Sequence, residues 1–428
     1  MGASSIPTTP IAFPSTEVRV RSGRVAFASL LLFIVLVYSV PGRLFFDNAG
    51  DVGIAKAVAG VALAALGCSW LLYARRLRLG GAVGLTLTIF FTWMVASSTW
   101  SLAPFITWQS LGELAKFFAI FFLVSNVVDD IDRAQQLLAV FAAASIIPAV
   151  GALWSFAHGQ HLVEGTRASW LGTFGDPNDL AYHLATGVAV ALGARRLESR
   201  RGIRLLWAAG IGVMLVAILF TQSRGGLITT GVVLTLYVLH AVKRTREAVP
   251  IVAVVIFAAL VAPSATWQRA STTLAYEDDA SALGRIDAWN TGKGIFAERP
   301  FAGVGLGSFI VAWAEYAPGN AGQARAPHNT FVEVLAETGL VGFVLFLTAL
   351  ALGLVWAVMA MRAQQTAALG FAVAAGLCAF AVASTTLGEL TSWPLYILLG
   401  LASSLRAIRR DEALAMRRQA GERLTHGR

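Results

Sequence analysis

The sequence has few charged residues and almost no cysteine. Only 13% of its 428 residues are charged and 57% are hydrophobic, whereas soluble domains carry roughly 25% charged residues. This composition excludes an ordinary soluble domain and predicts an all-α polytopic membrane protein. The two cysteines, Cys68 and Cys378, fall in apolar segments. We therefore expect two buried structural thiols and no disulfide or redox pair.

Motifs for metal and nucleotide binding are also lacking. The six histidines show no HExxH pattern, and no carboxylate or thiol is spaced to complete a site around His158 and His161. The glycine-rich run from Gly303 to Gly307 follows no predicted strand. We interpret it as a tight re-entrant turn and not as a nucleotide loop. The sequence thus predicts neither a metal site nor a cofactor.

Long apolar segments occupy most of the chain. Each is near the roughly 20 residues that cross a bilayer, and we expect each to form one transmembrane helix. The segments are residues 25–44, 54–73, 81–98, 112–128, 137–157, 179–194, 205–221, 225–242, 249–263, 339–361, 367–386 and 390–406. Residues 1–24 carry three prolines and no apolar core of a signal peptide, so we expect a disordered cytoplasmic tail.

Basic residues mark one side of these segments. If the N-terminus starts inside, the inside segments collect most of the 33 Lys and Arg residues. The positive-inside rule then places both termini in the cytoplasm. Helices 1–9 occupy 25–263, one large periplasmic loop with short helices occupies 264–338, helices 10–12 occupy 339–406, and a basic cytoplasmic tail occupies 407–428. Because this charge is a topology signal, we predict no nucleic-acid partner.

Two arginines stand out on the predicted outer side. Arg224 lies at a break between two apolar spans, where a charge is costly unless it snorkels, pairs or lines a polar cavity. Arg285 belongs to residues 283–296, where Trp289 and other apolar residues share one helical face, as in a helix on the membrane surface. Anchoring at the interface is the alternative interpretation for both arginines.

Two outer segments are expected to start helices. Asn178 or Asp179 can cap the sixth span. Pro327 breaks any earlier helix and Asn329 can cap a new one, which places His328 at a helix start on the outer side. A histidine there can act as a general base or contact a substrate hydroxyl. A solvated loop histidine is the alternative.

In combination, these motifs resemble the superfamily of O-antigen ligases and polymerases. The resemblance covers roughly residues 90–400, and each motif is weak alone. The matching stretches are Ser223 to Gly225, Gly284-Arg285 with Trp289, Pro300 to Phe309, His328-Asn329 and Leu335 to Leu340, with further similarity at Trp100 to Pro104 and Gly175 to Asn178.

The resemblance implies a metal-independent, inverting glycosyltransferase of the bacterial inner membrane, working among membrane lipids. Its donor is a glycan linked to undecaprenyl diphosphate, with Arg224 and Arg285 on the diphosphate and His328 near the hydroxyl of a glycan or lipid A-core acceptor. Further substrate-binding candidates are Trp289, Asn329, Glu333 and Glu337, the last two aligned at i, i+4.

Of the activities in this superfamily, we expect that of a ligase. The alternative is a polymerase of O-antigen or exopolysaccharide, and a protein O-oligosaccharyltransferase is favoured less than either. A polysaccharide transporter or flippase fits less well. Transporters usually show internal repeats and charges near the membrane midplane. This chain shows no repeat, and its polar motifs cluster on the outer side.

Overall fold

The computed structural model describes residues 16–40, 50–73, 77–241, 245–271, 280–319 and 322–426. Within these ranges the chain is helical, apart from turns and one isolated bridge between Val163 and Arg167. Each predicted apolar span coincides with a helix, so the all-α fold class is confirmed. These helices are α1 (Thr16–Ser39), α3 (Gly50–Tyr73), α4 (Gly81–Ser97), α5 (Pro104–Val127), α6 (Ile131–Ala157), α7 (Pro177–Leu197), α8 (Arg201–Thr221), α9 (Arg224–Ala241), α10 (Thr245–Val261), α14 (Thr330–Met361), α15 (Ala367–Ala383) and α16 (Trp393–His426).

The outer surface of the helix bundle is apolar. In the described part of the chain, α5, α6, α8 and α14 are long and apolar enough to cross a membrane, and shorter apolar stretches lie in α1, α3, α4, α10 and α15. Large side chains such as Leu206 and Leu260 are 70% and 79% exposed on the outside of α8 and α10. An exterior of this kind is typical of a protein surrounded by lipid. The chain is a polytopic membrane protein, and the count of twelve spans stays a prediction.

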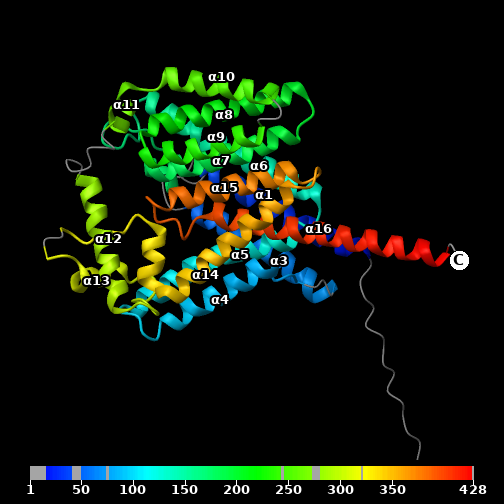
Figure 1. The fold of residues 1–428 in the computed structure, drawn as a ribbon, viewed down its shortest axis with the longest axis horizontal. Coiled ribbons are helices and arrows are strands. Elements are labelled where there is room, and N and C mark those ends of the chain that lie inside the picture. The colour runs from blue at the N-terminus through cyan, green and yellow to red at the C-terminus, as the bar shows by residue number, and fades with distance from the viewer. Residues whose placement is uncertain are drawn as a thin grey trace, which may run out of the picture.

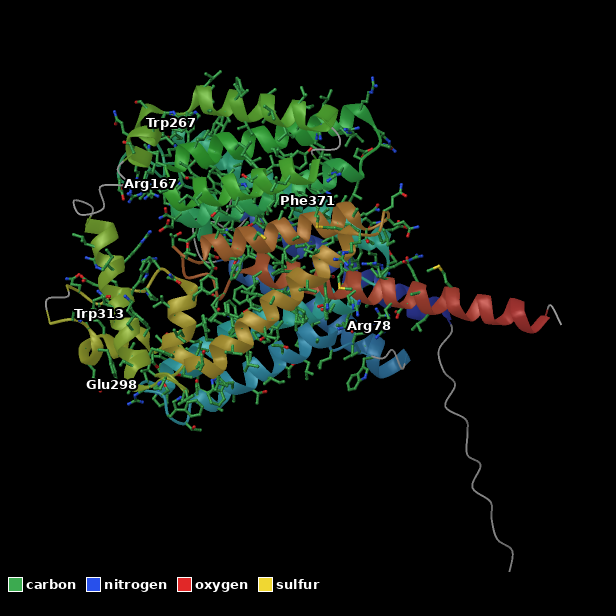
Figure 2. The ribbon with its side chains drawn as sticks, in the orientation of Figure 1. Arg78, Arg167, Trp267, Glu298, Trp313 and Phe371 are labelled. Carbon is green, nitrogen blue, oxygen red and sulfur yellow. The ribbon has the colours of Figure 1, made fainter. Side chains whose placement is uncertain are left out.

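Three further helices cover one end of the bundle. They are α11 (Ser264–Ser271), α12 (Ala280–Glu298) and α13 (Phe309–Tyr316). Figure 1 shows the long helices running in roughly the same direction, with α12 crossing their ends on the side away from the C-terminus. Figure 2 shows Arg167 and Trp313 at this covered end and Arg78 toward the other. The large loop therefore does contain short helices, while its side of the membrane stays a prediction.

Helix α7 forms the centre of the bundle. Its residues from 180 to 195 are all buried, and it packs against α6, α8, α9 and α15. Small residues allow this close packing. A Cβ on Gly187 would lie 2.5 Å from Ser145 of α6, and one on Gly193 would lie 2.6 Å from Ala372 of α15. Because α7 begins at the covered end, it is a rigid base for the residues that gather there.

Two predictions about helix ends are wrong. Helix α1 begins at Thr16, so residues 16–24 are helical and not disordered; the last proline before them is Pro14, and nothing after it stops a helix. The sixth span is capped by Asp176, whose carboxylate accepts a hydrogen bond from the N–H of Asn178 at 2.6 Å. Pro177 at the first helical position has no N–H to satisfy, which favours this earlier start.

Two further expectations concern the cysteines and the C-terminal tail. Both cysteines are free, as predicted, but Cys68 is exposed on α3 and only Cys378 is partly covered. The expectation that Cys68 is buried is therefore wrong, because an apolar segment next to lipid need not bury every small side chain. Helix α16 continues to His426, so the basic tail is helical as far as it is described.

Candidate functional site

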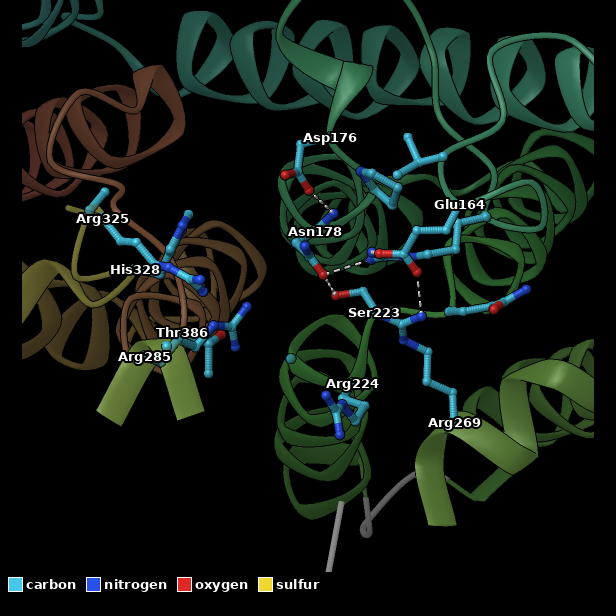
Figure 3. A pocket seen from close by; sticks show the side chains of 17 residues that line it. Glu164, Asp176, Asn178, Ser223, Arg224, Arg269, Arg285, Arg325, His328 and Thr386 are labelled. Atoms are coloured by element: carbon cyan, nitrogen blue, oxygen red, sulfur yellow. Dashed lines mark hydrogen bonds and ion pairs between the residues drawn. The ribbon is translucent and has the colours of Figure 1, made fainter. Parts of the chain in front are cut away.

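A polar cavity of about 260 Å³ lies at the covered end of the bundle. The three catalytic candidates, Arg224, Arg285 and His328, all line it, although they come from α9, α12 and the segment before α14. We call it the arginine cavity because five arginines and two carboxylates contribute to its lining. Figure 3 shows its labelled residues, which are Glu164, Asp176, Asn178, Ser223, Arg224, Arg269, Arg285, Arg325, His328 and Thr386.

Arg224 is placed by a sharp turn between α8 and α9. Gln222 closes α8 in a left-handed conformation with φ 53°, and α9 begins two residues later. The Ser223 hydroxyl donates to Oδ1 of Asn178 at 2.9 Å and accepts from the N–H of Gly226 at 3.2 Å. A side chain at Gly226 would overlap α7. Ser223 and Gly226 therefore stabilise the turn that places Arg224 at the cavity.

Arg167 joins the loop between α6 and α7 to this turn, and no sequence motif predicts it. Its Nε donates to the carbonyl oxygen of Thr221 at 3.0 Å, its Nη2 donates to Oδ1 of Asn178 at 2.9 Å, and its Nη1 lies 3.5 Å from Glu164. The side chain is only 6% exposed. Burial lowers the pKa of this guanidinium, but arginine starts so high that it stays charged. These partners offset the cost of burying the charge.

Glu164 also connects this loop to α11. Its Oε2 accepts a hydrogen bond from Nη1 of Arg269 at 2.6 Å. That hydrogen bond lowers the pKa of Glu164, against a smaller opposing effect of burial, so the pair stays ionic at neutral pH. Arg167 and Arg269 thus share one carboxylate. The carboxylate of Glu164 therefore balances part of the charge of these two arginines, which we call the rim arginines.

His328 lies on the opposite side of the cavity (Figure 3) and has a strained backbone. Its φ of 43° lies in the left-handed region, which residues other than glycine rarely adopt. Asn329 caps α14, since its Oδ1 accepts from two backbone N–H groups of the first turn at 3.0 and 3.1 Å. Nε1 of Trp289 donates to the carbonyl of Pro327 at 2.9 Å. The predicted helix start is confirmed, and these bonds hold His328 from both sides.

The surroundings of His328 favour its neutral form. Desolvation lowers the pKa of the imidazole below its ordinary value, and the charges of Arg285 and Arg325 lower it further, against an opposing effect of Asp176. At neutral pH the ring is therefore uncharged and can accept a proton. The Arg325 guanidinium lies against the backbone of Gly284, within 2.1 Å of where a Cβ would stand. Arg325 therefore lies close to the backbone directly before Arg285.

Glu333 and Glu337 line a different cavity, of about 330 Å³, between α5 and α14. We call it the glutamate cavity because Glu113 also lines it. Glu337 is buried, and its two carboxylate oxygens accept from the backbone N–H groups of residues 307 and 309 at 2.7 and 3.1 Å. Glu113 pairs with Lys116 at 2.5 Å, as expected from their i, i+3 spacing. Two of the three carboxylates therefore have partners within the fold.

The glycine-rich turn at 303–307 is a packing element. Gly303, Gly305 and Gly307 have φ of 65°, 97° and 76°, and side chains there would overlap Glu337 or serines near the start of α5. The N–H of Leu102 donates to the carbonyl of residue 304 at 3.0 Å. The predicted tight turn is confirmed. Its glycines allow the turn to pack closely against α14 and the start of α5.

The first turn of α14 and the segment between α15 and α16 lie between the two cavities. The N–H of Thr330 donates to the carbonyls of Ser384 and Leu387 at 2.8 and 2.9 Å, and its hydroxyl accepts from the N–H of Glu389 at 2.8 Å. These bonds join the first turn of α14 to the segment between α15 and α16. Residue 386 of that segment lines the arginine cavity, and residue 388 lines the glutamate cavity.

The chemistry of the arginine cavity is that of an anion site. Guanidinium groups bind phosphate and carboxylate oxygens through paired N–H donors, and here two of them, Arg285 and Arg325, act on the imidazole of His328. Across the described ranges, no three or more His, Cys, Asp or Glu side chains are grouped so that they could hold a metal ion.

Comparisons with known proteins show what the chain is similar to. Residues 209–347 match the family described as O-Antigen ligase, and this segment contains Arg224, Arg285 and His328. The chain is also similar to Exopolysaccharide production protein ExoQ of Rhizobium meliloti (strain 1021), with 24% identity over 261 residues, which are 58% of this chain. The match spans 59% of that relative, less than two thirds of its length.

These matches confirm the resemblance to the superfamily of O-antigen ligases and polymerases. Together with the apolar helices, they indicate a multi-pass bacterial membrane protein.

Proposed function

We propose that this protein is an O-antigen ligase-like glycosyltransferase, which moves a glycan from undecaprenyl diphosphate to an acceptor sugar. The observation that carries the proposal is the meeting of Arg224, Arg285 and His328 at one cavity at the end of an apolar helix bundle. A lipid diphosphate combines an anionic head with an apolar tail. The arginines suit the head, and the lipid around the helices suits the tail.

In the proposed reaction, His328 accepts the proton of the acceptor hydroxyl. The hydroxyl oxygen attacks the anomeric carbon of the donor sugar, and the bond from that carbon to the diphosphate oxygen breaks. The carrier leaves with the electron pair of that bond. Arg224 and Arg285 stabilise the charge that develops on the leaving oxygen. Attack opposite the leaving group inverts the anomeric centre, and the arginines neutralise the diphosphate without a metal ion.

The other candidates take different parts in this proposal. Trp289 and Asn329 use their polar atoms to hold the backbone around His328, so we assign them to positioning. Glu337 supports the glycine-rich turn. Glu333 is the candidate for direct contact with sugar, because a carboxylate at the glutamate cavity can accept hydrogen bonds from sugar hydroxyls.

Transfer itself can be tested with purified protein and a carrier-linked glycan. Product should form without ATP and in the presence of EDTA. Loss of turnover on chelation, restored by Mg²⁺, would mean that the arginines alone do not neutralise the leaving group.

Polymerisation is the second candidate, because the similar protein from Rhizobium meliloti is named for exopolysaccharide production. The two activities share the donor and differ in the acceptor. Lipid-linked glycans extracted from cells that lack the gene distinguish them. Finished polymer on the carrier indicates a ligase, and single repeat units indicate a polymerase. A glycan pool identical to that of the parent cells would contradict both.

We also propose that the arginine cavity faces the periplasm and that both termini are cytoplasmic. Gly319 lies after α13, and a Cβ added to it would meet open space. Ser199 is exposed in the turn between α7 and α8 at the opposite end. In intact spheroplasts, Gly319→Cys should react with an impermeant thiol reagent and Ser199→Cys should not. The reverse labelling would place the cavity in the cytoplasm.

A further inference from the structure

Arg325 is a cavity residue to which the reaction described above gives no part. It lies in the segment between α13 and α14, is exposed, and lines the arginine cavity. Its guanidinium lies across the backbone of Gly284, directly before Arg285. Figure 3 shows Arg325 beside His328, on the same side of the cavity as Arg285. A third guanidinium is therefore directed at the place where the reaction is proposed to occur.

The surroundings of Arg325 differ from those of the two rim arginines. Arg167 and Arg269 share the carboxylate of Glu164, at 3.5 and 2.6 Å. For Arg325 the structure shows no hydrogen bond or ion pair with any residue in the ranges it describes. Its positive charge nevertheless acts on His328, as that of Arg285 does. Like charges near one another in a partly enclosed site repel, and a bound anion removes that cost.

We propose that Arg325 binds the second phosphate of the lipid carrier and thereby makes the cavity select a diphosphate over a monophosphate. The inference rests on the proposed function. Each phosphate of a diphosphate offers charged oxygens to a separate guanidinium. With Arg224 and Arg285 on one part of the head group, Arg325 can hold the other. A carrier with one phosphate has no second group for Arg325 to bind.

The test compares two carrier lipids on the full-length protein in detergent. Affinities for undecaprenyl diphosphate and undecaprenyl monophosphate are measured for the wild type, Arg325→Gln, Arg325→Lys and Lys293→Gln. Lys293 is exposed on α12 and does not line the cavity, so its variant removes the same charge nearby. Arg325→Gln should weaken diphosphate binding about tenfold, the scale of one charged hydrogen bond, and monophosphate binding less than about threefold.

The ratio of the two affinities is the decisive result. It should fall in Arg325→Gln, fall less in Arg325→Lys, and stay at the wild-type value in Lys293→Gln, with unchanged thermal unfolding in all variants. An equal loss for both lipids, or no loss, overturns the role of Arg325. If Arg325→Gln and Arg325→Lys keep the wild-type ratio while the wild type transfers glycan, the role of Arg325 fails and the proposed function stands. If the wild type binds neither lipid and transfers nothing, the proposed function fails as well.

Discussion

The arginine cavity and the glutamate cavity lie on either side of the first turn of α14 and have opposite chemistry. The arginine cavity is lined by five arginines and two carboxylates, and the glutamate cavity by three glutamates and no arginine. Yet they differ more in how their charges are used. Glu337 and Glu113 have partners within the fold, whereas the charges of Arg285 and Arg325 act on the imidazole of His328. Two charges of the arginine cavity therefore act on a titratable side chain, whereas two charges of the glutamate cavity act within the fold.

The two cavities are also mechanically connected. His328 and Glu333 lie on the two faces of the same helix start, and Thr330 between them is fastened to the segment after α15. The arginine cavity is the proposed place of chemistry, and the glutamate cavity is proposed to hold sugar and support the turn. Substitutions on the two sides should therefore have separable effects.

The largest effect is expected from His328→Ala. Loss of a general base lowers turnover by roughly 10²- to 10⁴-fold, while donor binding should stay nearly unchanged because the arginines remain. Donor-lipid binding and turnover are measured side by side on the purified variant. His158→Ala is the control, since His158 is an exposed histidine after α6 that lines neither cavity. If His328→Ala abolishes donor binding instead, His328 is a binding residue and not the base.

Arg224→Lys and Arg285→Lys should have the next largest effect. Lysine keeps the charge but loses the planar pair of donors, and loss of such a transition-state donor lowers turnover by roughly 10²- to 10³-fold. Arg204→Lys in α8, which lines neither cavity, should leave turnover unchanged. Wild-type turnover in both cavity variants would show that they serve as interface anchors.

The sequence predicted the helices well because apolar length and spacing are local properties. Each predicted span matches a helix, and the break before Arg224, the cap at Asn329 and the turn at 303–307 were read from neighbouring residues. Arg224, Arg285 and His328 were grouped through the resemblance to a family. The structure places them at one cavity, and their roles stay proposals.

The arrangement of each cavity could not be predicted, because it depends on residues far apart in the chain. Asn178 looked like a helix cap, but its side chain joins Arg167 and Ser223. Arg167 and Arg325 lie in loops without a recognisable motif. Glu333 and Glu337 were predicted to bind substrate together with Arg224 and Arg285, but they line the glutamate cavity instead.

Glu337→Gln and Glu333→Gln sharpen the comparison within the glutamate cavity. Glutamine at 337 keeps one acceptor oxygen and faces the second backbone N–H with an amide group, so we expect a loss of roughly 1–3 kcal/mol in unfolding free energy. Glu333→Gln should unfold like the wild type and bind the acceptor more weakly. Thermal unfolding in detergent and the acceptor concentration for half-maximal turnover are measured for both. Equal unfolding of the two variants would contradict the structural role of Glu337.

The smallest effect is expected in the pH dependence, and it distinguishes the cavities most directly. As a general base, His328 must be neutral, and desolvation together with Arg285 and Arg325 lowers its pKa below the ordinary 6.5. The value of kcat/KM should therefore be constant from about pH 8 down to the ordinary histidine pKa of about 6.5 and fall only below it. Arg325→Gln removes one repelling charge, so the acid limb should move to higher pH. The limb should not move in Lys293→Gln or Glu333→Gln. If kcat/KM of the wild type already falls above pH 6.5, or if the fall does not move in Arg325→Gln, another group titrates.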